Sequence, residues 1–144
     1  MIWGLKSRFW GIVPMRIVGM LAVAMAAGAA AAPIPTRTSV GSFAIDPAKA
    51  VSHVEMWRVD FLPGQQMPKH MHPVPVVCFV SKGSFLVSIG KAPVRTVTVG
   101  DATLEPAGET VHYFRNMSAK EPAQLYCSIL AGADDKQLSV MLGK

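Results

Sequence analysis

The sequence predicts an all-β protein, built as a single antiparallel β-sandwich or β-barrel domain. Short extended segments rich in β-branched and aromatic residues recur about every ten residues, and turn-forming residues separate them. No stretch of useful length has the apolar period of a helix. These observations favour two packed β-layers over any helical or mixed architecture.

The first expected strand lies in "AVSHVEMWRVDFLPG", residues 50–64, where apolar and polar side chains occur on both faces of a long extended segment. Each later segment ends in turn chemistry such as Lys-Gly, Gly-Lys-Ala-Pro or Gly-Asp. In chain order these segments are "VVCFVS", "SFLVSI", "VRTVTV", "ATLEP", "HYFRN" and "AQLYCSIL".

The run "VVCFV", residues 76–80, is apolar on both faces. We therefore expect one face to line the barrel interior, and the other to be covered by a second sheet or by another subunit of a homodimer.

The amino terminus resembles a secretory signal peptide. Residues 1–16 carry Lys6, Arg8 and Arg16 and no acid, and residues 17–32 are small and apolar with Ala-x-Ala cleavage patterns. An uncleaved anchor is the alternative, but the apolar stretch is shorter than the roughly 20 residues that span a membrane. We expect cleavage after Ala31, export to the periplasm and no membrane anchor afterwards. Residues 32–49 would then form an N-terminal extension and first strand, and residues 50–144 the barrel.

Charge and length limit the function classes. The whole chain has a net charge of +5, but removal of residues 1–31 leaves eleven basic and nine acidic residues, a net charge of +2. Because the remainder has no cluster of Lys and Arg, we do not expect a nucleic-acid partner. The remaining 113 residues suffice for one domain with its own core.

The two cysteines, Cys78 and Cys127, both lie in apolar strand-like segments. In an oxidising compartment they can pair as a disulfide. They can equally pack as two separate buried thiols, because the sequence does not give the distance between them.

His70 and His72 form a His-x-His pair. Alternate residues of a strand share a face, so these two imidazoles would lie on one side with roughly 6.5 to 7 Å between their Cα atoms. Two side chains at this separation can hold one divalent ion, although the spacing also arises by chance.

A longer pattern surrounds this pair. Gly64 is followed after five residues by His70 and His72, then after three residues by Val76, and after six more by Gly83. The second pattern runs from Gly100 through five residues to Pro106-Ala107-Gly108, then three residues to His112 and three more to Asn116.

Together these patterns resemble the two motifs of the cupin superfamily, over about residues 50–130. The resemblance implies a small RmlC-like double-sheet jelly roll, a β-barrel with a metal pocket inside, and His70, His72 and His112 as metal ligands. Two departures stand out. Val76 occupies the position of the family's glutamate ligand, and one extra residue separates Gly108 from His112, which a β-bulge can absorb.

Glu105 is the candidate that replaces the missing acid. It lies in "ATLEPAG", where the family commonly has an apolar residue, and a charged group inside a barrel needs a cation or a strong partner. If Glu105 instead faces solvent, it would pair with a lysine. An inward Glu105 completes a site of three histidines and one glutamate, and without it the three histidines resemble the iron centres of thiol dioxygenases.

The sequence thus predicts an exported cupin that binds one divalent metal ion (Zn, Fe, Mn, Ni or Cu) and a small-molecule ligand or substrate. As an enzyme it would be a dioxygenase, isomerase or decarboxylase, although no residue stands out as a general base. The alternatives are a periplasmic binding protein without turnover and a barrel that has lost its metal.

Overall fold

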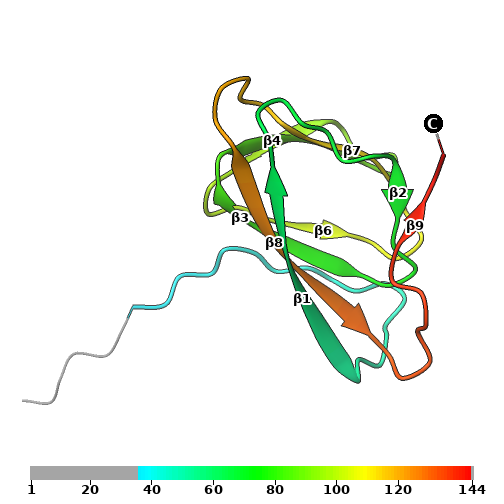
Figure 1. The fold of residues 1–144 in the computed structure, drawn as a ribbon. Coiled ribbons are helices and arrows are strands. Elements are labelled where there is room, and N and C mark those ends of the chain that lie inside the picture. Colours follow the sequence, from blue (N-terminus) through cyan, green and yellow to red (C-terminus); the bar gives the residue numbers. More distant parts are fainter. Residues whose placement is uncertain (1–35, 144) are drawn as a thin grey trace, which may run out of the picture. The chain divides into compact units, whose positions relative to one another are not determined.

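The computed structural model describes residues 36–143, which form two antiparallel sheets that face each other (Figure 1). The four-stranded sheet has the order β1-β8-β3-β6, and the five-stranded sheet has the order β5-β4-β7-β2-β9. The strands are β1 (His53–Phe61), β2 (His70–Met71), β3 (Val76–Lys82), β4 (Ser84–Ile89), β5 (Arg95–Thr98), β6 (Ala102–Glu105), β7 (Thr110–Asn116), β8 (Ala123–Ala131) and β9 (Val140–Met141).

This architecture confirms the all-β double-sheet jelly roll, with no helix among residues 36–143. In that part of the chain there is accordingly no helix long and apolar enough to cross a membrane. The predicted signal peptide and its cleavage point lie outside the described residues.

Each of the strand segments expected between residues 76 and 131 is present as β3 to β8. The stretch from His70 to Gly83 is not one strand, because Pro73 and Pro75 interrupt it. Its first part, β2, pairs with β7 and β9, whereas its second part, β3, pairs with β6 and β8 in the other sheet. The chain has no strand between residues 36 and 52, so the first strand begins at His53.

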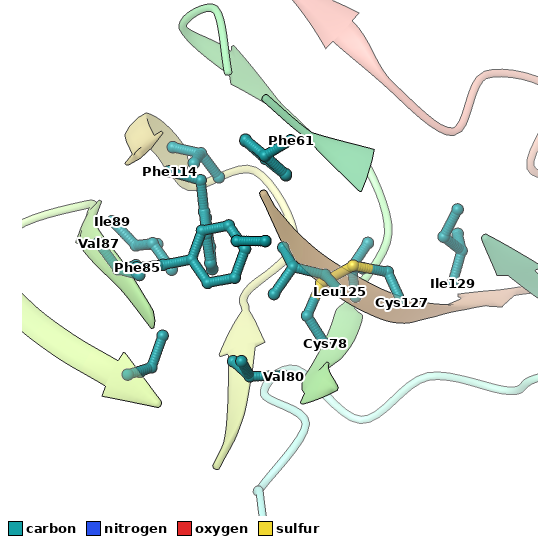
Figure 2. Close-up of a cluster of buried hydrophobic side chains, with 14 of the residues drawn as sticks. Phe61, Cys78, Val80, Phe85, Val87, Ile89, Phe114, Leu125, Cys127 and Ile129 are labelled. Atoms are coloured by element: carbon teal, nitrogen blue, oxygen red, sulfur yellow. A yellow bond between two sulfur atoms is a disulfide. The ribbon is translucent and has the colours of Figure 1, made fainter. Parts of the chain in front are cut away.

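The core fills the space between the sheets. Phe85 lies at its centre, with ring centroids 5.0 Å from Phe61 and 5.8 Å from Phe114 in edge-on arrangements (Figure 2). Alternate side chains of β3, β4 and β8 are buried around them, as the period of two predicts. These packed side chains hold the two sheets together next to the site described below.

A disulfide joins Cys78 on β3 to Cys127 on β8, directly across the strand pair (Figure 2). The sequence left open a disulfide or two separate thiols, and the structure has the disulfide. Residues 49 positions apart in the chain are covalently joined next to the core.

Candidate metal centre

His70 lies in β2, between β7 and β9, and only 6% of its surface is exposed. Its Nδ1 is 2.8 Å from the carbonyl oxygen of Pro68. Because a carbonyl oxygen only accepts hydrogen bonds, Nδ1 must carry the proton and donate it. The neutral ring therefore has its lone pair on Nε2.

His72 follows the end of β2 and is buried to the same extent. Its Nδ1 donates to the carbonyl oxygen of Leu138 at 2.6 Å, from the segment just before β9. The rings of His70 and His72 meet edge to face with centroids 5.0 Å apart. Backbone carbonyls thus fix both imidazoles with Nε2 free, as is usual for histidines that bind metal ions.

Glu105 is the last residue of β6, and 5% of its surface is exposed. Its Cα pairs directly with that of Val76 on β3, so both side chains project to the same face of the sheet. The expected inward orientation of Glu105 is therefore confirmed. The carboxylate comes from the strand beside the one that carries it in the family motif.

The three side chains converge. Glu105 Oε2 lies 3.2 Å from His72 Nε2 and 3.8 Å from His70 Nε2, and one ligand atom of each residue lies within 4.8 Å of the others. Yet Oε2 is buried and has no hydrogen-bond partner with acceptable geometry among the described residues. With both Nδ1 atoms protonated, neutral rings would direct lone pairs toward a carboxylate oxygen.

Such an arrangement requires a cation between the three groups, either a proton or a metal ion. Two imidazole nitrogens and one carboxylate oxygen are also a common ligand set for divalent metal ions. The residues present therefore fit a bound divalent ion.

The pKa values of His70 and Glu105 in the metal-free protein also favour a positive charge between these groups. Burial alone would lower the pKa of His70, but Glu105 and the Pro68 carbonyl outweigh burial and raise it. Burial alone would raise the pKa of Glu105, but the adjacent His70 and His72 outweigh burial and lower it. Both pKa shifts favour a positive charge beside an ionised Glu105 carboxylate.

His112, the third expected histidine, is not part of this cluster. Its side chain is exposed on β7, and its Nε2 is 3.2 Å from the carbonyl oxygen of Gly90. The group formed by His70, His72 and Glu105 contains no fourth ligand from the described residues. The assignment of His112 as a ligand is therefore corrected.

The reason is the position of a β-bulge. Ser88 pairs with Tyr113, and Ile89 pairs with Val111, which leaves His112 as the additional residue on β7. The bulge absorbs the extra residue at His112 itself, so Val111 takes the inward position opposite His70. Asn116 keeps a structural role, since its side-chain amide donates to the carbonyls of Leu62 and Glu121.

The cluster lines a pocket of about 90 Å³. Its lining residues are Trp57, Val59, Phe61, Met67, His70, His72, Val76, Glu105, Phe114, Leu125, Cys127, Ser139 and Met141. Phe85 is buried, whereas Phe79 and Tyr126 are exposed.

The sequence did not indicate the contribution of the carboxyl-terminal segment. The carbonyl oxygen of Leu138 accepts the hydrogen bond of His72, and Ser139 and Met141 line the pocket. The backbone N–H of Leu142 donates to the carbonyl oxygen of Lys69. The alternation in "LSVML" is the available signal, but it is too short to separate from chance. The Leu138 contact uses a backbone atom, which no side-chain pattern reveals.

Comparison with known proteins agrees with this architecture. Residues 57–129 match the family model described as "Cupin domain", so the chain belongs to the cupin family. Germin-like protein 1-1 of Oryza sativa subsp. japonica is 35% identical over 86 residues, which cover 56% of this chain and 38% of that protein.

Solved structures give the same result. An oxalate oxidase in complex with the substrate analogue glycolate is 29% identical with a TM-score of 0.53, covering 62% of this chain and 46% of the oxidase. Lactobacillus farciminis oxalate decarboxylase, at 18% identity and a TM-score of 0.53, covers 62% of this chain and 26% of its own, and shares the fold. The chain thus spans less than half the length of these relatives.

Proposed function

We propose that this cupin binds one divalent metal ion through His70, His72 and Glu105 and uses it to transform a small molecule. The observation that carries the proposal is the convergence of the Nε2 atoms of His70 and His72 on a buried oxygen of Glu105 that has no hydrogen-bond partner among residues 36–143. The similarity to an oxalate oxidase supports an enzymatic reaction of a small molecule.

The ligand set favours one metal and one type of reaction among those considered. Two histidines and one carboxylate with open positions are typical of non-haem Fe(II) oxygenases, so we propose iron and an oxidation among the reactions considered. When bound, the ion would supply Lewis acidity and electron transfer to ligands in its open positions. The protein's own residues hold the ion, fix both histidine tautomers and surround the open positions with apolar side chains.

A metal- or ligand-binding protein without turnover is the second candidate. It is favoured by the lack of a dedicated general base among the described residues that line the pocket, whose only ionisable side chains are the three proposed ligands.

Export and self-association are also proposed. The Cys78–Cys127 disulfide supports an oxidising compartment and hence the predicted signal peptide. Phe79 and Tyr126 pair across β3 and β8 and are 37% and 41% exposed on the outer face of the sheet, which supports a homodimer.

Elemental analysis tests the metal site. Protein purified without chelator should contain about one equivalent of metal, and His72→Ala should lower the affinity for that metal by about 100-fold or more. His112→Ala is the matched control, because it removes an imidazole outside the cluster, and it should retain the wild-type metal content. Less than about one tenth of an equivalent in the wild-type protein, unrecovered on soaking with Fe(II), Mn(II) or Zn(II), would refute the site.

Turnover separates the two candidate functions. An enzyme of the proposed class should consume oxygen in the presence of a substrate, and His72→Ala should abolish this while His112→Ala should not. Metal binding without oxygen consumption across phenolic, thiol and keto-acid compounds would favour the binding protein.

A further inference from the structure

We infer that the pocket takes a small molecule with one metal-binding head group and an uncharged apolar body, and that it discriminates against dicarboxylates. The placement of the head group rests on the proposed metal site. The placement of the apolar body does not, because it depends only on the other residues that line the pocket.

The rest of the pocket lining is almost entirely apolar. Beyond the three proposed ligands, the lining consists of aliphatic, aromatic and sulfur-containing side chains and one hydroxyl, that of Ser139. Val59, Phe61 and Trp57 come from alternate positions of β1, which places them on one face of that strand. Leu125 and Cys127 occupy alternate positions of β8.

The charges of the lining exclude a second anionic group. None of the lining residues is a lysine or an arginine, and both histidines are committed to the ion. One carboxylate of a ligand could bind the ion, but a second carboxylate in the apolar part would be buried without a cationic partner. Val76 and Leu125, which are 1% and 3% exposed, offer it no hydrogen bond.

The volume of the pocket limits the length of the ligand's apolar body. Apolar cavities of about 150 Å³ hold a benzene molecule, so in proportion a pocket of about 90 Å³ encloses roughly four carbon atoms, and a longer body extends to its mouth. Met141, 62% exposed, and Trp57, 39% exposed, line the pocket and still contact solvent, which places them at its mouth. The flexible thioether of Met141 can adjust to bodies of different shape.

An isosteric pair of probes tests this inference. 4-Methylpentanoate and succinate have the same skeleton, with two methyl groups in one where the other has two carboxylate oxygens. We expect Zn(II)-loaded protein to bind 4-methylpentanoate about tenfold or more tightly than succinate. The readout is the shift of the Met67 and Met141 methyl signals in protein labelled with ¹³C-methyl methionine.

Met141→Lys provides the charge test, with Met141→Gln as the matched uncharged control. Because position 141 is exposed, neither change threatens the core. A lysine there can direct its ammonium group toward the mouth and partner the second carboxylate of succinate. We expect Met141→Lys to reduce the preference for 4-methylpentanoate about fivefold or more, whereas Met141→Gln should leave it within about twofold.

A metal-free measurement separates this inference from the metal site. 4-Methylpentanol has the same body without a charge, and it should shift the Met67 methyl signal even in metal-free protein. If the protein takes up no zinc but binds the alcohol at Met67, the proposed metal function fails and the apolar pocket stands. Absence of that shift up to the solubility limit of the alcohol, or equal binding of succinate and 4-methylpentanoate to zinc-loaded protein, would overturn the inference.

Discussion

Exchanging the side chains of Glu105 and Val76 should preserve a metal site that Glu105→Val alone destroys. The two residues are direct Cα partners on adjacent antiparallel strands, their side chains share a face, and both are at most 5% exposed. Glu105→Val removes the one carboxylate of the proposed ligand group and should lower the Zn(II) affinity by about 100-fold or more. The double variant Val76→Glu/Glu105→Val should recover at least about tenfold of that loss, because it returns a carboxylate to the same face from β3.

Competition with a chromophoric chelator measures these affinities, and circular dichroism verifies that each variant is folded. The Val76→Glu single variant completes the cycle. It places two carboxylates side by side and should be less stable than the wild type without metal, with part of the stability restored by zinc. A folded double variant that binds zinc as weakly as Glu105→Val would contradict the proposed role of Glu105.

The inward position of Glu105 was one of two alternatives that the sequence left open, because a carboxylate in this strand must either find a specific partner inside the barrel or face solvent. The His-x-His pair was predictable, since its two side chains needed only to share one face. Both are buried at the site, although Pro73 ends their strand after Met71. These predictions depend on local chain geometry and local charge.

The orientation of His112 depends on register, which the sequence left undetermined. In the family's second motif, two residues separate the glycine from the histidine and three separate the histidine from the asparagine. Counting forward from Gly108 therefore places the third histidine at residue 111, whereas counting back from Asn116 places it at residue 112. A bulge must reconcile the two counts, and its position decides which side chain faces inward. The pairing of β4 with β7 puts the bulge at His112, so Val111 faces the core.

The contribution of β9 was not predictable for a different reason. A two-residue strand has almost no periodic signal, and the Leu138 carbonyl that holds His72 is a backbone atom. Likewise, the sequence could not give the distance between Cys78 and Cys127, which became neighbours only through the pairing of β3 with β8.

Removal of the disulfide should cause the largest loss of stability among these changes. The Cys78→Ala/Cys127→Ala variant should unfold with a free energy lower by about 2 to 4 kcal/mol, because the bond closes a loop between residues 49 apart and so restricts the unfolded chain. Urea titration followed by circular dichroism measures this difference. Wild-type protein unfolded with a dithiol reductant is the matched control, since it loses the bond and keeps both sulfur atoms.

A loss of less than about 1 kcal/mol in both samples would show that the bond contributes little to the fold. Zinc binding then tests whether the two cysteines only stabilise the fold or also act as metal ligands. Cys78 Sγ lies 3.5 Å from Glu105 Oε1, and Cys127 lines the pocket, but neither belongs to the group of proposed ligand atoms. Under conditions where the variant remains folded, it should therefore bind zinc within about tenfold of the wild-type affinity, because His70, His72 and Glu105 are unchanged.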